Sequence, residues 1–409
     1  MELCSRERLA STLATLRPVL DIVEGRVEDV EPPSWCEQRG WSEFLLSLSD
    51  ADLQRCEAHG LDLCIAELDA APASLRDLAR AVTAAAEPPF FALGDARFEG
   101  DGRQVSIRKR QQLAALLAAI DPMARRSARV VDVGAGRGAL TRFCAVRFER
   151  TTLGIERSVE RLLVATRNAP PGAALEFRTS DVLRDGLDLK PDDLAVGLHA
   201  CGELGDALTA SVAVARCHLA LIPCCLQKIS APFRAPLSRA AQGLAFSRSC
   251  LGLTNQTAQA EGVETSLERA LDARMVRYAL SQLLRENGVE VATGEEMRGV
   301  NRRRAQRGLS ALAARAFSLR GLAPPSAASV ARHERSARAR FDKIRRLALP
   351  RSMLSRLVEL SIALDRASVL EERGLHTRVG TLFARSVSPR NLAIFAGPDA
   401  TSLPAYAAG

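Results

Sequence analysis

Four side chains that can carry out chemistry follow two apolar runs in the middle of the chain. His199 and Cys201 lie in "GLHACGELGD", and Cys224 and Cys225 lie in "LIPCCLQK". An imidazole with a pKa near neutral can remove a proton from a hydroxyl or a nitrogen, so His199 is a candidate general base. A thiol of Cys201 or Cys224 can attack a substrate covalently. General-base catalysis and covalent catalysis therefore both predict catalytic residues in these two stretches of the sequence.

Two other interpretations of the same residues stay open. Together the four could bind zinc, but adjacent cysteines seldom both reach one tetrahedral ion and the usual two-residue spacing is missing. We therefore predict no metal. The adjacent cysteines could also pack as small apolar groups. We favour substrate-pocket residues, with His199 as base, Cys201 and Cys224 as further catalytic candidates and Cys225 in substrate binding.

A glycine loop provides the second candidate site. "VVDVGAGRG" contains Asp132, Gly134, Gly136 and Gly138 after an apolar run and before a helix. Glycines let the backbone approach a ligand closely, and the amides at a helix N-terminus are unpaired. Dinucleotide-binding enzymes use a similar loop, so the loop alone predicts only a nucleotide-like ligand.

Two further acids narrow the choice of ligand. Glu156 ends the next expected strand, where an acid can accept hydrogen bonds from ribose hydroxyls. Asp181, in "TSDVL", can accept a hydrogen bond from an adenine amine. Either acid could instead cap a helix. Three acids at successive strand ends together with the glycine loop resemble the S-adenosylmethionine-dependent methyltransferases of the Rossmann-like class, which implies S-adenosyl-L-methionine as cofactor.

These residues need a parallel sheet to bring them together. Strands are expected in "ARVVDVG", "TTLGIER", "LEFRTSDVL", "DLAVGLHACG" and "HLALIPCC", and helices separate them. Such alternation predicts an α/β fold with right-handed crossovers and a ligand at the carboxyl ends of the strands. Two more strands, "HTRVGTLFA" and "RNLAIFAG", predict a terminal hairpin that completes seven strands.

The chain divides into four expected segments. Residues 1–88 form an N-terminal helical domain, and residues 89–255 form the Rossmann-like core. Residues 256–350 are a basic helical insertion, and residues 351–409 add a helix and the β-hairpin to the core sheet. The length of 409 residues suits one main core with additions.

The chain also resembles a narrower family, that of methyltransferase-like protein 25 and its relatives. The resemblance runs through "PPSWCEQRGWSEFLLSLSDADL", "SIRKRQQL", "VVDVGAGRG", "GLHACGELGDAL", "PCCLQK", "LDRASVLEERG" and "SPRNLAIFA". It implies the class I fold and the S-adenosylmethionine cofactor, held by the glycine loop, Asp132, Glu156, Asp181 and His199. Enzymes that methylate adenine N6 place Asn or Asp, two prolines and an aromatic residue after strand four, and this chain has His199-Ala200-Cys201-Gly202 instead. Cysteines from these two strand ends attack the base in RNA cytosine-5 methyltransferases.

Charge favours RNA as the methyl acceptor. The formal net charge is +8, and nearly all basic residues are arginines. Arginine suits phosphate and planar stacking, although a high-GC bacterial genome would also supply it. Arg108, Lys109 and Arg110 could bind a substrate phosphate or the cofactor carboxylate. The arginines of 302–304 and 332–346 form a candidate phosphate-binding stripe, although a solvated helix face explains them nearly as well and aromatic residues for base stacking are scarce.

We therefore predict a cytoplasmic S-adenosylmethionine-dependent methyltransferase that acts on RNA. No window is apolar enough for a membrane span, and the N-terminus lacks the apolar run of a signal peptide. Alternatives are a protein or small-molecule methyltransferase, or a non-catalytic module that binds S-adenosylmethionine. An NAD-dependent enzyme is disfavoured by Asp181. The sequence leaves the oligomeric state open.

Overall fold

The chain folds into two compact units, each built from separate stretches of sequence. The computed structural model describes residues 3–65, 70–93, 105–255, 264–291, 295–300 and 302–407. Unit 1 contains residues 1–18, 84–258 and 355–409, and unit 2 contains residues 19–83 and 259–354. The boundaries of the four segments expected from the sequence stay a prediction. The division into two units shows, in addition, that each unit is discontinuous in sequence.

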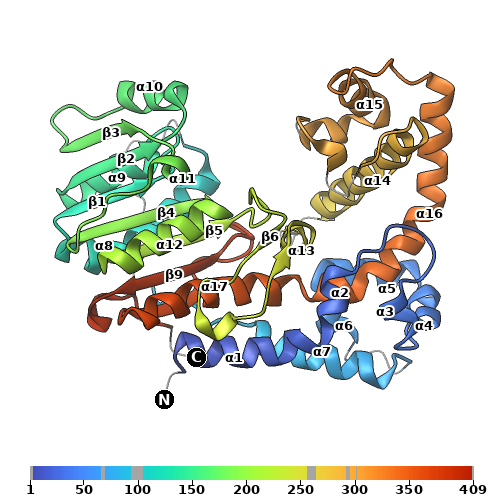
Figure 1. Cartoon of the computed structure of the whole chain (residues 1–409), viewed down its shortest axis with the longest axis horizontal. Helices are drawn as coiled ribbons and strands as arrows, with labels where there is room; N and C mark the ends of the chain where they lie inside the picture. The colour runs from blue at the N-terminus through green and yellow to red at the C-terminus, as the bar shows by residue number, and fades with distance from the viewer. Residues whose placement is uncertain are drawn as a thin grey trace. The chain divides into compact units, whose positions relative to one another are not determined.

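Unit 1 is built on a seven-stranded sheet with the order β3-β2-β1-β4-β5-β9-β8 (Figure 1). The strands are β1 (Arg129–Val133), β2 (Thr151–Glu156), β3 (Leu175–Thr179), β4 (Asp193–Cys201), β5 (His218–Cys224), β8 (His376–Thr381) and β9 (Leu392–Gly397). β1 to β5 are parallel, and β9 is antiparallel to both β5 and β8. The predicted Rossmann-like class I sheet with its terminal hairpin is confirmed.

Helices cover the two faces of this sheet because alternate side chains of the central strands point to opposite faces. Leu194 and Val196 of β4 belong to an apolar cluster with helices α8 and α9. Gly197 faces the opposite way, toward α12, where an added Cβ would lie 2.8 Å from Leu208 Cδ2. The main helices of unit 1 are α1 (Ser5–Leu16), α8 (Ile107–Arg126), α9 (Ala139–Phe148), α10 (Val159–Arg167), α11 (Val182–Asp185), α12 (Glu203–Ala215), α13 (Arg248–Leu253) and α17 (Ser355–Glu372).

Short elements complete unit 1. They are the two-stranded pair β6 (Phe233–Arg234) and β7 (Phe246–Ser247), and the 3-10 turns η2 (Arg239–Ala241) and η5 (Ala400–Ser402). β6, η2 and β7 lie between β5 and α13 in the chain, and η5 follows β9. None of them belongs to the main sheet.

Unit 2 is helical and has a core of its own. Its helices are α2 (Leu20–Glu24), α3 (Ser34–Glu37), α4 (Ser42–Ser47), α5 (Asp50–His59), α6 (Leu61–Ile65), α7 (Ala73–Ala86, whose last turn belongs to unit 1), α14 (Glu264–Glu286), α15 (Leu309–Ser318) and α16 (Ala327–Met353). The 3-10 turns are η1 (Arg17–Val19), at the junction of the units, η3 (Glu295–Met297) and η4 (Arg302–Arg307). Leu283, Leu312 and Phe341, from α14, α15 and α16, meet in one buried apolar cluster. The predicted helical character of the N-terminal region and of the insertion is confirmed.

None of the helices in the described ranges combines the length and the apolar character that a membrane crossing requires.

Candidate active site

The glycine loop connects β1 to α9 and is shaped by left-handed backbone. Gly134, Gly136 and Gly138 have φ values of 80°, 61° and 73°. A Cβ on Gly138 would lie 2.7 Å from Phe177 Cζ and 2.8 Å from Ala165 Cβ, so only glycine fits there. A Cβ on Gly134 would meet nothing closer than 3.5 Å. The loop is therefore tightly packed against its own unit at Gly138, whereas a Cβ at Gly134 would make only an ordinary van der Waals contact with Leu204, so the backbone there is less crowded.

Glu156 is fixed beside this loop. Its Oε2 accepts a hydrogen bond from the Gly136 amide at 3.0 Å, and its Oε1 accepts one from the Ser158 amide at 3.0 Å. The residue is 5% exposed, and Arg161 lies 3.8 Å from Oε1. Two backbone amides thus hold the carboxylate in one orientation at the end of β2, where each oxygen keeps a second lone pair for a hydroxyl donor.

Asp132 and Asp181 have different surroundings. Asp132 is 2% exposed, and its Oδ2 accepts a hydrogen bond from Thr141 Oγ1 at 2.7 Å, which ties the end of β1 to α9. Burial raises the pKa of Asp132 to about 6. Asp181 caps α11, because its Oδ1 accepts from the Leu183 amide at 3.2 Å. The capping role that the sequence left open is thus present, and cofactor binding by either acid stays a prediction.

His199 lies at the end of β4, where the strand bulges. The register with β5 shifts between Leu198 and Ala200, and His199 has a φ of 66°. Its Nε2 is 3.0 Å from Gln112 Oε1, so Nε2 donates to this amide oxygen and Nδ1 carries the lone pair. Burial, with the charges of Lys109 and Arg108, lowers the pKa of His199 to about 4. The imidazole is therefore neutral at pH 7.

The three predicted site cysteines converge. Cys201 Sγ and Cys224 Sγ are 3.0 Å apart, and the sulfurs of Cys201, Cys224 and Cys225 all lie within 4.8 Å of one another. The Cys224 thiol donates to the His199 carbonyl at 3.0 Å. The pKa of Cys225 is lowered, because hydrogen bonding within the cluster of Cys201, Cys224 and Cys225 and the positive charge of Lys228 favour its thiolate. The trio therefore favours one thiolate on Cys225 stabilised by its neighbours.

A tight turn locks the two cysteine-bearing strand ends together. Gly202 has a φ of 46°, and a Cβ there would lie 2.0 Å from the Lys228 carbonyl oxygen. The Gly202 amide donates to the Cys224 carbonyl at 3.3 Å, and the Glu203 amide donates to the Lys228 carbonyl at 3.1 Å. Arg366 of α17, which is fully buried, donates to the Gly202 carbonyl at 2.9 Å. The loops after β4 and β5 are thus one packed assembly.

Cations surround the β4 and β5 end of the site. Lys109 lies close enough to interact with the charges of Asp132 and Cys224, and burial lowers its pKa. Arg108 donates to the Val387 carbonyl at 2.8 Å, and Arg110 donates to the Val105 carbonyl at 3.1 Å. Of the three predicted basic residues, Lys109 interacts electrostatically with Asp132 of β1 and Cys224 of β5. Arg108 and Arg110 each donate a hydrogen bond to a backbone carbonyl.

Three further residues belong to this site that the sequence did not single out. Gln112 of α8 is 4% exposed and contacts His199. Lys228 Nζ is 3.7 Å from Cys201 Sγ. Arg390 donates to the Thr254 carbonyl at 2.7 Å, and its charge acts on both His199 and Cys225. Lys228 and Arg390 stand in the quoted motifs "PCCLQK" and "SPRN", so those motifs contained the signal.

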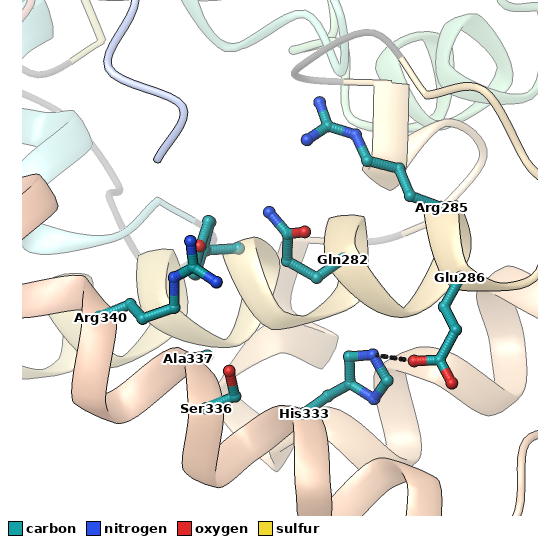
Figure 2. Close-up of a pocket in the computed structure, with 8 residues that line it drawn as sticks. Gln282, Arg285, Glu286, His333, Ser336, Ala337 and Arg340 are labelled. Carbon is teal, nitrogen blue, oxygen red and sulfur yellow. Dashed lines mark ion pairs between the residues drawn. The ribbon is translucent and has the colours of Figure 1, made fainter. Parts of the chain in front are cut away.

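A pocket of about 300 Å³ lies between α14 and α16 of unit 2 (Figure 2). His333 Nε2 is 2.6 Å from Glu286 Oε2, and Arg340 pairs with Asp29. The pocket is lined by Tyr278, Gln282, Arg285, Glu286, His333, Ser336, Ala337 and Arg340. None of the predicted site residues is among them, so the strand ends of unit 1 remain the candidate active site.

Comparison with known proteins gives the class of this domain. Residues 108–232 match the family model of a methyltransferase domain. A TehB-like SAM-dependent methyltransferase from Corynebacterium glutamicum is 18% identical over 27% of this chain and 66% of that chain, with a TM-score of 0.21. Coclaurine N-methyltransferase, solved with N-methylheliamine and SAH, is 14% identical over 51% of this chain and 62% of that chain, with a TM-score of 0.23. The alignments thus span just under two thirds of both solved chains.

The family match covers β1 to β5 and the glycine loop, and the sheet order is that of the class I fold. The chain therefore contains a class I methyltransferase domain, an enzyme domain whose methyl donor is S-adenosylmethionine. The narrower resemblance to the methyltransferase-like protein 25 family stays a prediction.

Proposed function

We propose that the protein methylates RNA. The observation that supports this most directly is the charge around His199, where Lys109, Arg108 and Arg390 all act to lower its pKa. Arg108 and Arg390 act on His199 at the end of β4, and Lys109 acts on Cys224 at the end of β5 as well as on Asp132 at the end of β1. A positive potential on the acceptor side of the site favours an acceptor that carries phosphates.

The exposed cations of α16 add a weaker argument. Several of its arginines are already paired inside unit 2: Arg345 with Glu57 at 2.6 Å and Arg346 with Asp50 at 2.5 Å. Arg335, Arg338 and Lys343 are exposed and have no ion pair with any described residue. These three remain available for phosphate contacts. The side chains of residues 302–304 lie outside the described residues.

The cofactor fits the residues that the structure places at the β1 and β2 ends. The backbone at Gly134 and the fixed Glu156 carboxylate would hold the nucleoside, with Asp181 at the end of the next strand, β3. S-adenosylmethionine supplies an activated methyl group. Orienting donor and acceptor in line accounts for much of the acceleration in such a reaction.

His199 would handle the proton that the acceptor loses. With Nε2 donating to Gln112, Nδ1 is the atom that can accept a proton. Its pKa of about 4 makes it a weak base that is always in the basic form at neutral pH. The imidazole can therefore accept the proton of the acceptor only transiently and would pass it on to solvent, because its protonated form is not stable at neutral pH. We also place the protein in the cytoplasm, where reducing conditions would keep the site thiols reduced.

The test measures transfer of tritiated methyl from S-adenosylmethionine to total RNA and, separately, to total protein, both from cells that lack the gene. We expect RNase-sensitive label with the wild-type protein. Glu156→Ala should reduce it about 100-fold or more, because the side chain that would accept hydrogen bonds from the ribose hydroxyls of the cofactor is lost. Glu160→Ala is the matched control, since Glu160 is exposed on the next helix. Label in protein alone, or in neither pool while the cofactor binds, contradicts the proposal.

A second variant pair tests the electrostatic argument. Lys109→Gln should weaken RNA binding and lower the dependence of binding on salt, because one phosphate contact is removed. Lys190→Gln, at an exposed lysine in the turn before β4, should change neither. Equal effects of both substitutions on binding in a filter or polarisation assay would remove the support that Lys109 gives to RNA.

A further inference from the structure

The cysteine trio has a geometry that neither methyl transfer nor packing requires. Cys201 ends β4, Cys224 ends β5, and the two are register partners across the parallel pair. Cys225 follows directly, yet its sulfur joins the others within 4.8 Å. Among the described residues, this is the one set of three or more histidine, cysteine or acidic side chains whose ligand atoms are this close together.

The backbone at Cys225 explains how adjacent cysteines reach the same point. Cys225 has a φ of 41°, in the left-handed region that non-glycine residues avoid. Four described non-glycine residues have a positive φ, and two of them, Glu149 and Arg216, simply end helices α9 and α12. Cys225 and His199 do not end helices. Backbone strain of this kind is typical of functional sites.

Positive side chains lie beside the three sulfurs. Lys228 Nζ lies 3.7 Å from Cys201 Sγ, and the charges of Lys228 and Arg390 act on Cys225. A divalent ion held by three thiolates carries a net charge of −1, which these cations offset. The His199 ring is not part of the set, because its nitrogens do not join the group of ligand atoms that lie within 4.8 Å of one another.

We propose that Cys201, Cys224 and Cys225 form a trithiolate site for a soft metal ion, with Zn²⁺ as the ion. Sulfur-only ligands select Zn²⁺ or Cu⁺ over hard cations. With Zn–S bonds of about 2.3 Å, sulfurs in a tetrahedral site lie about 3.8 Å apart, so the trio needs only small movements. Three protein ligands leave the fourth position for water or a substrate atom. The left-handed turn at Cys225 removes the objection that adjacent cysteines cannot share one ion.

The experiment uses Co²⁺ as a spectroscopic probe on the full-length, reduced, chelator-treated protein. We expect one equivalent of Co²⁺ per chain to produce sulfur-to-cobalt charge-transfer absorption and tetrahedral d–d bands, and one equivalent of Zn²⁺ to abolish both. Zn²⁺ should also protect three thiols from alkylation, identified by mass spectrometry as Cys201, Cys224 and Cys225. These readouts are independent of any methyl acceptor.

Two cysteine variants test whether Cys201, Cys224 and Cys225 produce the Co²⁺ absorption. Cys225→Ala should weaken Co²⁺ binding about 100-fold or more, whereas Cys217→Ala, a buried cysteine just before β5, should leave it unchanged. Circular dichroism shows whether each variant is folded. Folded wild-type protein without charge-transfer bands, equal loss in both variants, or a Cys201–Cys224 disulfide in place of metal protection would each overturn the proposal.

Discussion

At the scale of single residues, His199 and Asp132 give the site opposite responses to pH. The pKa of His199 is lowered from 6.5 to about 4, and that of Asp132 is raised from 3.8 to about 6, each mainly by burial. The stability that neutral His199 contributes is present above pH 6.5 and is lost as pH falls toward 4. Asp132 does the reverse, since its buried charge destabilises the fold as pH rises from 4 to 6.

Replacing the histidine should reveal this balance. His199→Gln removes one of the two responses, so the free energy of unfolding of the variant, relative to wild type, should rise on going from pH 7 to pH 4.5. The gain should be on the order of 2 kcal/mol. Urea denaturation at both pH values measures it. His376→Gln, at an exposed position, is the control, and an equal shift in that variant would show that burial of His199 is not the cause.

Sequence patterns identified most residues of this site, but not their partners. Gln112 lies in an amphipathic helix whose period predicts burial, and nothing local distinguishes a buried glutamine that orients a histidine 87 positions away. The approach of the Cys225 sulfur to those of Cys201 and Cys224 was not predictable either, because no sequence pattern indicates a left-handed φ at a cysteine. Residue types that can carry out chemistry can be identified from the sequence, but the backbone geometry and the contacts that bring them together cannot.

At the scale of elements, the turn after β4 and the loop after β5 act as one piece. The Lys228 carbonyl oxygen occupies the place where a Cβ of residue 202 would lie, and Arg366 supports the turn from α17. Arg366 is bonded in turn to Asp206 of α12 at 2.8 Å. Glycine at 202 is therefore required twice, by its positive φ and by the backbone it touches.

Adding a methyl group at this turn should be costly. Gly202→Ala places a Cβ 2.0 Å from a backbone oxygen, which requires the two loops to separate. We expect a loss of about 3 kcal/mol or more in the free energy of unfolding, from strain and overpacking together. Gly243→Ala has a similar φ penalty, at +80°, but its Cβ meets nothing within 4 Å, so it should lose only about 1 kcal/mol. Equal urea midpoints would contradict the assigned contact.

The order of elements in unit 1 was largely predictable. Apolar runs of strand length alternate with helical periods from β1 to β5, and the glycine loop marks the first crossover. The antiparallel place of β9 beside β5 followed from resemblance, because pairing between strands more than 150 residues apart leaves no local pattern. Helix ends were set by caps that the sequence does show, such as Ser49 before α5.

At the scale of the whole molecule, each unit has an apolar cluster of its own among the residues that the structure describes. One joins α8 and α9 to the sheet, and the other joins α14, α15 and α16. Residues 19–83 and 259–354 fall in the same unit although strands β1 to β5 of the sheet are encoded between them. This association was not predictable from sequence, because helical periodicity says which face is buried but not which segment covers it.

Two core truncations should separate the stabilities of the units. Leu283 and Ile222 are fully buried, one in each core. Leu283→Ala should lower the midpoint of one thermal transition by removing about 2–5 kcal/mol, and Ile222→Ala should lower the other. S-adenosylmethionine should raise only the transition that Ile222→Ala lowers. A single transition that both variants lower and the cofactor raises would show that the two units unfold together.

The discontinuity of both units also decides when the protein can fold during its own synthesis. β9 must enter between β5 and β8, and the helices of 19–83 must wait for those of 259–354. At about 5–20 residues per second, the ribosome needs roughly ten to thirty seconds to make the chain between such partners. Throughout that time the β5 edge and the apolar helices of the first segment are exposed. Neither unit can therefore complete its fold until the second of its sequence-distant segments has been synthesised.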